Sequence, residues 1–454
     1  MGRIVPLLAC FSLVTYGRRV QWPAEEMQTL GPLSLAEVSS EDGPQRVASE
    51  PPVPLDLRLG LTTPVSGREV RWCFIGTGRV AHDFAQALKS VDGAVLSVVA
   101  ARNEARLSRT KEFAALHGFQ YVAPSYADAL ARSDVDIVYL NTLHQYRVQH
   151  VETILKAGKP VLVEKPFALN AADARRLVEL ARKKDLFIME GMWTRFFPAV
   201  EQARALIDSG TLGGVVKVLS DFSFNAGDGG NYPVKPYPEI TPNDGDPIFH
   251  LESGGGSLLY AGPYPLAAGV LPFTNLKPKR VVAAGVVDPY TQIDLSFSLS
   301  LSFEKAGGPA DAESNAPQGS CPPRGASVSI AAGVDGESTE FTSYVGTRGR
   351  ITILPPAHCP TSFKLEVKGE GRGNVSEIIH EYPLPSLPSS VLAAPTNPGS
   401  TEYFYYPNSN GFQYEAEAVQ RCLLAGLKEC PQYPNDEMLK VMDLMDQVRT
   451  QIHL

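Results

Sequence analysis

The chain has 454 residues, of which 44% are apolar, and 41 basic and 49 acidic residues give it a formal net charge of −8. That length is ample for two hydrophobic cores and predicts a globular protein of two or three domains. The basic residues form neither a stripe nor a run interleaved with aromatics, so we expect no nucleic-acid partner. The six cysteines include no C-x-x-C pair and no histidine at zinc spacing, so no metal site is expected.

Residues 1–67 are predicted to be an extension outside the folded domains. Its beginning, 4–14, resembles the apolar region of a signal peptide, and both a cleaved targeting segment and a disordered extension fit this pattern. The run is too short to span a bilayer, so we expect no membrane span. Residues 21–67 are acidic and lack periodicity, which is typical of a disordered linker. The cytoplasm is the location we expect.

Residues 68–195 are predicted to form a Rossmann domain, because short apolar strands alternate with helical patterns as in a doubly wound parallel sheet. The expected strands are 70–75, 94–101, 121–122, 137–141, 161–164 and 186–189. Helices are expected from 81, from 103, near 126–131, up to 157 and from 170. The fold class is therefore α/β for this part of the chain.

Residues 196–454 are predicted to form an α+β domain with an open-faced antiparallel sheet, because its strands are joined without long helices. The expected strands are 215–224, 280–287, 294–303, 326–332, 338–344, 349–354 and 363–367, followed by helices at 412–425 and 436–452. Residues 306–325 are rich in Gly, Pro, Ala and Ser and are expected to be a disordered insertion. One sheet face needs cover, which predicts a homodimer.

The first strand leads into Gly76-x-Gly78-x-x-Ala81, the pattern of a dinucleotide-binding turn. Gly76 permits the tight turn, Gly78 lets the backbone approach a pyrophosphate, and Ala81 lets the helix pack closely and direct its N-terminus at the phosphates. The predicted cofactor-binding residues of this turn are Gly76, Thr77, Gly78, Arg79, Val80 and Ala81.

Arg102 ends the second strand, roughly 20 residues after this turn, where an acidic residue would bind the ribose of NAD. A guanidinium can pair with a 2′-phosphate, which favours NADP(H) over NAD(H). A solvated arginine without a ligand is the alternative.

Lys165 follows an apolar strand and precedes Pro166, which cannot continue the ladder. Its ammonium is therefore expected at the carboxyl edge of the parallel sheet, where open α/β folds bind ligands. A surface lysine in a loop is the alternative. Further along, the glycines at 254–256 would allow a close approach to a cofactor, and Tyr260 and Tyr264 are one helical turn apart. Either tyrosine could be a packing residue or an acid/base.

Five motifs together are specific to one family. They are Gly76-x-Gly78-x-x-Ala81, the Ala-Ala-Arg at 100–102, Glu164-Lys165-Pro166, the segment MEGMWTRFFP at 189–198 and GGGSLL at 254–259. Through them, residues 69 to roughly 450 resemble the glucose–fructose oxidoreductase/inositol dehydrogenase (Gfo/Idh/MocA) family. The resemblance is strongest to its branch of dimeric dihydrodiol dehydrogenases and NADP-dependent D-xylose dehydrogenases.

The resemblance implies an NADP-dependent oxidoreductase that acts on an aldose C1 or a diol carbon, with Lys165 and Tyr264 as the catalytic pair. An ammonium beside a tyrosine favours the phenolate, so Lys165 is expected to lower the pKa of Tyr264. The resemblance also implies cofactor contacts from Thr142, Glu164 and Lys165. Four residues are candidates for the substrate pocket, although an aromatic cluster after a strand is as often core: Trp193, Arg195, Phe196 and Tyr260.

The chain departs from the family pattern in three places. Tyr260 stands where many relatives have Asp, and Thr142-Leu143, followed by His144, replaces the usual Thr-Pro pair. The extension and the insertion at 306–325 are also outside the pattern. Two other functions therefore remain open: a dinucleotide-binding regulator without catalysis and an NAD-dependent glycoside hydrolase.

Overall fold

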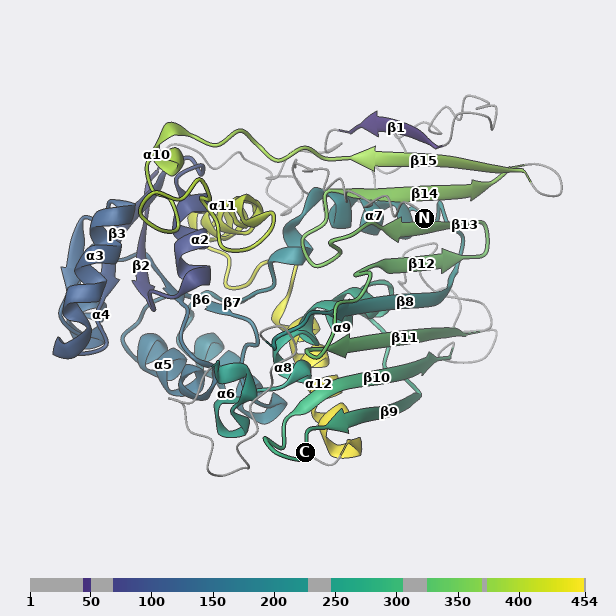
Figure 1. Cartoon of the computed structure of the whole chain (residues 1–454), viewed down its shortest axis with the longest axis horizontal. Helices are drawn as coiled ribbons and strands as arrows, with labels where there is room; N and C mark the ends of the chain where they lie inside the picture. Colours follow the sequence, from purple (N-terminus) through teal and green to yellow (C-terminus); the bar gives the residue numbers. More distant parts are fainter. Residues whose placement is uncertain (1–43, 50–67, 228–245, 305–324, 370–373, 453–454) are drawn as a thin grey trace, which may run out of the picture.

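The computed structural model describes residues 44–49, 68–227, 246–304, 325–369 and 374–452. Figure 1 shows two sheets beside each other, a six-stranded parallel sheet and a nine-stranded mixed sheet. None of the helices in these ranges is both long enough and apolar enough to cross a membrane.

The parallel sheet has the strand order β4-β3-β2-β5-β6-β7, in which the direction of winding reverses between β2 and β5. All its pairs are parallel, and its central strands are buried along almost their whole length, as expected for a sheet covered on both faces. The strands are β2 (Val70–Ile75), β3 (Ala94–Ala100), β4 (Tyr121–Ala123), β5 (Ile137–Leu140), β6 (Val161–Glu164) and β7 (Ile188–Gly191). The predicted Rossmann fold is confirmed.

Helices connect these strands, and in Figure 1 α5 and α6 lie on the opposite side of β6 and β7 from α2. They are α2 (Arg79–Leu88), α3 (Leu107–His117), α4 (Tyr126–Leu130), α5 (His144–Lys156) and α6 (Ala171–Lys183). Helix α6 begins after Asn170, whose side chain accepts a hydrogen bond from the Asp173 amide. Its buried face is the predicted one, with Ala174, Leu177, Val178 and Ala181.

The nine-stranded sheet has the order β1-β15-β14-β13-β12-β8-β11-β10-β9. Seven of its strands were predicted from alternating patterns, within a few residues at each end. They are β8 (Val215–Ser223), β9 (Arg280–Val287), β10 (Asp294–Phe303), β11 (Ala326–Gly333), β12 (Thr342–Gly346), β13 (Gly349–Ile353) and β14 (Ser362–Lys368). The sheet is mixed rather than purely antiparallel, because β8 lies in its middle and pairs in parallel with β11, and β1 pairs in parallel with β15.

Three helices pack on one face of this sheet: α7 (Pro198–Asp208), α9 (Pro263–Gly269) and α12 (Asn435–Gln451). Along β10, the side chains that face these helices are buried and apolar, whereas Ser298 and Ser300 on the opposite face are exposed. Helices α11 (Phe412–Leu424) and α12 also contact the first domain, through α2 and α6 respectively. The C-terminal helices therefore join the two halves of the molecule.

Two expectations about this domain are corrected. Residues Gln45–Ala48, expected within a disordered linker, form β1 and pair in parallel with β15 (Val375–Glu381), a strand that was not expected. The physical reason is that the outer edge of β15 offers unpaired backbone groups, which β1 satisfies. Strand β12 begins at Thr342 rather than at 338, because Glu340 has a left-handed φ of 51° that a strand cannot contain. The rest of the extension (1–43 and 50–67) and the insertion, up to 324, lie outside the described residues.

Candidate active site

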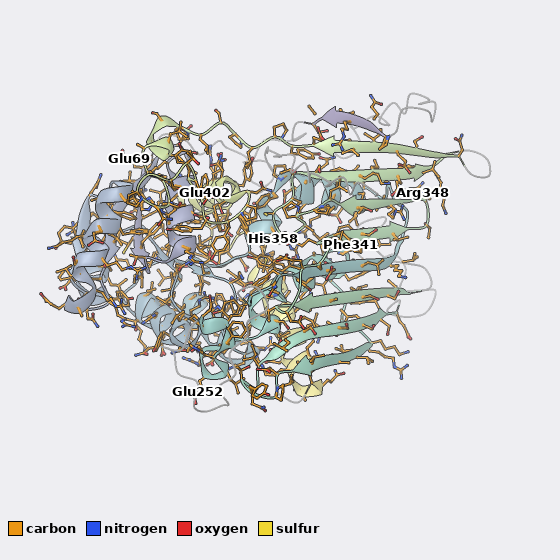
Figure 2. The ribbon with its side chains drawn as sticks, viewed as in Figure 1. Glu69, Glu252, Phe341, Arg348, His358 and Glu402 are labelled. Carbon is orange, nitrogen blue, oxygen red and sulfur yellow. The ribbon has the colours of Figure 1, made fainter. Side chains whose placement is uncertain are left out.

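A cavity of about 760 Å³ lies between the carboxyl edge of the parallel sheet and the nine-stranded sheet. His358, which lines it, is labelled in Figure 2 between the two sheets. The first domain contributes Gly78, Arg79, Val80, Arg102, Thr142, Glu164 and Lys165, among others. The second domain contributes Phe222, Asp246, Tyr260, Tyr264, Glu340, His358, Tyr406 and Phe412, among others.

The predicted phosphate-binding turn lies at one end of this cavity. Gly76 has a φ of 116°, and a Cβ there would be 1.9 Å from the Asn141 carbonyl oxygen, so glycine is required by the close approach of the end of β5. Gly78, Arg79 and Val80 line the cavity, whereas Gly76, Thr77 and the fully buried Ala81 do not. Three residues of the turn therefore line the cavity, and the other three determine the backbone conformation of the turn.

Helix α2 presents its N-terminus to the same end of the cavity. Its N-cap, Gly78, makes no side-chain capping hydrogen bond, and its first turn contains no acidic residue. The first amides of a helix have no intrahelical partner, and the helix dipole favours an anion beside them. This end of the cavity thus fits the pyrophosphate of a dinucleotide.

Arg102 lines the cavity just after β3, in the expected position, and its side chain is exposed. Tyr126 and His150 line the cavity with it, and His150 Nδ1 lies 3.1 Å from the Thr142 hydroxyl. Burial, helped by the charge of Arg102, lowers the pKa of His150, which therefore stays neutral at pH 7. Among these three residues, Arg102 therefore carries the permanent positive charge. A site that binds a 2′-phosphate requires such a charge.

The structure brings Lys165 and Tyr264 together. Lys165 directly follows β6, and its Nζ lies 4.6 Å from the centre of the Tyr264 ring. The same ammonium donates a hydrogen bond of 2.8 Å to the backbone carbonyl of Tyr260. Lys165 is thereby fixed against the tyrosine that the resemblance assigns as its partner.

Burial shifts the pKa values of this pair in opposite directions. It raises the pKa of Tyr264 well above the usual 10, and the neighbouring Glu164 carboxylate adds to this effect. It also lowers the pKa of Lys165 to about 8, although Glu164 opposes the shift. The expected lowering of the Tyr264 pKa by Lys165 is therefore wrong for the free protein, because desolvation outweighs the ammonium. At neutral pH the site holds a protonated phenol beside a mostly charged ammonium.

The three consecutive glycines approach other protein segments rather than the cavity, which corrects their expected role. A Cβ on Gly254 would lie 2.5 Å from Leu169 Cδ2, and one on Gly256 would lie 2.1 Å from Asp294 Oδ1. The Asp294 carboxylate accepts hydrogen bonds from the Ser257 hydroxyl and the Leu258 amide. The glycines thus let the helix after them dock tightly on β10.

Tyr260 and Tyr264 lie on two short helices, α8 (Ser257–Tyr260) and α9, and not on one continuous helix as the spacing predicted. Both nevertheless line the cavity. The Tyr260 ring lies 4.5 Å from that of His144, whose Nδ1 is 3.0 Å from the Gly254 carbonyl oxygen. Tyr260 therefore belongs to the wall beside α5.

Aromatic side chains surround Tyr264. Trp193, predicted as a pocket residue, lines the cavity and stacks on Phe412 with ring centres 4.2 Å apart. Phe222 meets Tyr264 edge to face at 5.2 Å. This part of the cavity is suited to a ring or another compact apolar body that carries polar groups.

Arg195 and Phe196 are not part of this cavity, which corrects the expectation that they contact substrate. The Arg195 guanidinium is 2% exposed, pairs with Glu437 at 2.9 Å and donates to the Ala267 carbonyl oxygen. Phe196 is fully buried in the core. Both belong to the tight helical turn η3 (Trp193–Phe196), in which successive side chains point in different directions, so only part of the motif reaches the cavity.

Several lining residues that come from separate connections were not predicted from the sequence, above all Glu340 and His358. No motif marks them, because each stands alone between strands. His358 Nδ1 lies 2.8 Å from Glu340 Oε2. Within the described parts of the chain, no group of three or more metal-binding side chains occurs, and Cys73, Cys359, Cys422 and Cys430 are buried.

Comparison with known proteins places this site in a family. Residues 70–192 match the Gfo/Idh/MocA model, described as an oxidoreductase family with an NAD-binding Rossmann fold. The chain is 32% identical over 385 residues to trans-1,2-dihydrobenzene-1,2-diol dehydrogenase from Sus scrofa, covering 84% of this chain and 97% of that protein. It is 30% identical over 391 residues to the Homo sapiens enzyme of the same name, with the same shares covered.

Solved structures share the fold. A 3-ketoreductase from Actinomadura kijaniata in complex with NADP and TDP-benzene has a TM-score of 0.61 and 21% identity, covering 85% of this chain and 98% of that one. A levoglucosan dehydrogenase in complex with NADH and levoglucosan has a TM-score of 0.64 and 14% identity, covering 85% and 97%. Together with the identity to full-length relatives, the Rossmann sheet and the cavity at its carboxyl edge show that this chain belongs to the Gfo/Idh/MocA family of oxidoreductases.

Proposed function

We propose that this protein is an NADP-dependent dehydrogenase that transfers a hydride between the nicotinamide and a carbon bearing a hydroxyl group. The observation that carries the proposal is the contact of Lys165 with Tyr264 in the same cavity that receives the N-terminus of α2. A dinucleotide held at α2 would share one enclosed space with a proton donor and a cation. That combination is what carbonyl reduction and alcohol oxidation require.

Different residues of the chain would carry out proton transfer, charge stabilisation and cofactor binding. The nicotinamide, when bound, supplies or accepts the hydride. Tyr264 gives its proton to the carbonyl oxygen in reduction, and as the phenolate it takes the hydroxyl proton in oxidation. The Lys165 ammonium donates to the same oxygen and stabilises the phenolate while it exists. Gly78, Arg79 and Val80 would hold the pyrophosphate, and Thr142 and Glu164 would line the path between it and Lys165.

The preference for NADP(H) rests on Arg102, which is placed in the cavity where a 2′-phosphate can pair with its guanidinium. The ketoreductase with the same fold was solved with NADP, and the levoglucosan dehydrogenase was solved with NADH. The fold therefore accommodates both cofactors, and the arginine is the feature of this chain that favours the phosphorylated one.

For the substrate we propose a dihydrodiol or an aldose such as D-xylose. The names of the curated relatives support a cyclic diol, and so do the aromatic walls formed by Trp193, Phe222 and Phe412. The test is steady-state NADPH formation over dihydrodiols, pentoses and hexoses. Turnover of at least one of them with NADP is expected. Cofactor binding without any turnover would instead indicate a regulator, and tightly held NAD without net reduction would indicate a glycoside hydrolase.

Three further expectations remain proposals: a homodimer formed through the open sheet face, a cytoplasmic location, and domain limits at 1–67, 68–195 and 196–454. Light scattering would test the first. Cell fractionation with an antibody against the chain would test the second. Limited proteolysis followed by mass determination would test the third, with cleavage expected first before residue 68.

A further inference from the structure

Glu340 places a carboxylate beside the aromatic part of the cavity wall around Tyr264. It lies in the connection between β11 and β12, with a φ of 51° that is uncommon for a residue with a side chain. Its side chain is 16% exposed and lines the cavity. A carboxylate held there on a strained backbone is costly, and such strain is concentrated at functional sites.

His358 fixes one of the two carboxylate oxygens. Its Nδ1 lies 2.8 Å from Glu340 Oε2, and its ring centre lies 5.4 Å from that of Tyr264 and 4.6 Å from that of Phe222. Burial disfavours the charged imidazole, but Cys359 and Glu340 raise the pKa of His358 to about 10, so it is a charged donor at neutral pH. Its Nε2 is 3.4 Å from Cys359 Sγ, so both ring nitrogens face protein atoms.

The second carboxylate oxygen is left for a ligand. Within the described ranges, His358 is the hydrogen-bond donor to this carboxylate, and Oε1 accepts no hydrogen bond there. An ionised carboxylate only accepts hydrogen bonds, so this oxygen can take a hydrogen bond from a ligand in the cavity. The matching ligand group is therefore a hydroxyl, and an anionic group would be repelled.

We infer that Glu340 is the specificity-determining residue of this site: its carboxylate, held by His358, accepts a hydrogen bond from a second substrate hydroxyl next to the one that Tyr264 and Lys165 handle. The inference rests on the proposed function and narrows its substrate class to vicinal diols. Together with Glu164 and Asp246, Glu340 also lines the cavity with a carboxylate, although Tyr260 replaces the aspartate that many relatives carry.

The test measures kcat/KM for a diol, trans-cyclohexane-1,2-diol, and for its mono-hydroxy analogue, cyclohexanol. Both substrates are compared in the wild type and in Glu340→Gln. The amide keeps the size of the side chain and an acceptor for His358, but it removes the charge. We expect kcat/KM for the diol to fall about 10- to 100-fold, mainly through KM, because a charge-assisted hydrogen bond is lost. For cyclohexanol, kcat/KM should change less than about twofold.

A binding measurement makes the result independent of turnover. Titration calorimetry of the diol into the protein loaded with NADPH, a complex that cannot oxidise it, should show a Kd about 10- to 100-fold weaker in Glu340→Gln. Glu337→Gln is the matched control, since Glu337 is exposed on the same connection and does not line the cavity.

The outcomes separate the two proposals. Diol binding that depends on Glu340 but is not followed by turnover would uphold the recognition role and overturn the proposed dehydrogenase. Turnover of diols with equal kcat/KM in the wild type and Glu340→Gln would uphold the dehydrogenase and overturn the recognition role. Equal losses for the diol and cyclohexanol would also overturn it, as would the absence of any diol binding.

Discussion

The environment of Lys165 and Tyr264, more than their identity, sets what they can do. Both side chains are half-buried, and their partial removal from water opposes the charged form of each. The phenol therefore keeps its proton at neutral pH, whereas the ammonium, with a pKa lowered to about 8, keeps most of its charge. The resting protein is thus prepared as a proton donor for carbonyl reduction, whereas alcohol oxidation first needs the phenol to lose its proton, so that the phenolate can accept the proton of the substrate hydroxyl.

Tyr264→Phe should lower turnover by about 10²- to 10⁴-fold while NADP affinity changes little, because the ring packing stays and the transferable proton is lost. Steady-state kinetics and a fluorescence titration of NADPH would measure both. Tyr260→Phe is the control, since it lines the same cavity, and its smaller effect should be mostly on KM. Near wild-type turnover in Tyr264→Phe together with an inactive Tyr260→Phe would assign the proton transfer to Tyr260 instead.

The pH dependence of reduction should reveal Lys165. Since its pKa is lowered to about 8, the ammonium is present below this pH and is lost above it. For carbonyl reduction, kcat/KM should therefore fall as pH rises through about 8. Lys165→Arg keeps a cation at all these pH values, so its activity, although lower, should lack that decline. A wild-type profile that stays flat to pH 9.5 would exclude Lys165 as the group that stabilises the reacting oxygen.

Arg102→Asp should raise the Kd for NADP by about tenfold or more, because the pair with the 2′-phosphate is replaced by repulsion, and should leave the Kd for NAD much less affected. Isothermal titration with both cofactors would measure the difference. Arg106→Asp is a useful comparison, since Arg106 is exposed nearby and does not line the cavity. Equal wild-type affinity for the two cofactors would remove the basis for the NADP assignment.

At the scale of elements, helix α2 presents its N-terminus to the cavity and also holds a segment of the second domain. Its residue Asp83 is fully buried and accepts hydrogen bonds from the amides of Tyr405 and Tyr406 and from the Ser409 hydroxyl. These donors lie in the segment 403–409, which comes from the second domain. Because Tyr406 and Pro407 line the cavity, Asp83 ties one wall of the cavity to the helix that should bind the pyrophosphate.

Asp83→Ala should lower the free energy of unfolding by about 1–3 kcal/mol, because three donors lose their acceptor. Burial raises the pKa of Asp83 to about 6, above its unfolded value, so the wild type loses stability as pH rises from about 4 through 6. The stability difference between wild type and variant should therefore be larger at pH 5 than at pH 8. Urea unfolding at both pH values would measure it, with the exposed Asp92→Ala as a control expected within about 0.5 kcal/mol.

The sequence predicted those elements whose pattern is local. The parallel strands were visible as short apolar runs, and Lys165 was placed correctly because a strand and a proline flank it. Strands β1 and β15 were not visible, because each is stabilised by pairing with a segment far away in the chain. For the same reason Glu340 and His358 were missed, since their meeting depends on the register of β12 to β14. Arg195 was misplaced because its partner, Glu437, is on the last helix.

At the scale of the whole molecule, contacts distant in sequence hold the two halves around the cavity. Helix α12 ends the described chain, yet Asp446 accepts a hydrogen bond from the Ala171 amide at the start of α6, and Asp443 pairs with Arg175. None of these four residues lines the cavity. The geometry of the active site therefore depends on a helix that contributes no residue to it, and the open face of the large sheet is left on the opposite side from these helices.

That open face is the basis for the predicted homodimer. On β9, Val282 is 60% and Val286 56% exposed, and Val282 lies directly opposite Ser300 of β10. A broad face of small and β-branched side chains is unusual on the surface of a monomer. A two-fold pairing of this face would bury it against itself. Light scattering should therefore give about twice the chain mass of 49.1 kDa at micromolar concentration.

Ser300→Arg should dissociate that dimer, because each chain would bury an unpaired charge in the paired face, and the mass should fall to that of one chain. Lys111→Glu on α3 is the control, since it changes an exposed charge on the other domain and should leave the mass unchanged. Activity per chain should survive dissociation, because the face lies across the sheet from the helix layer that carries Tyr264. A wild-type mass near 49.1 kDa would contradict the dimer, and an unchanged dimer in Ser300→Arg would place the interface elsewhere.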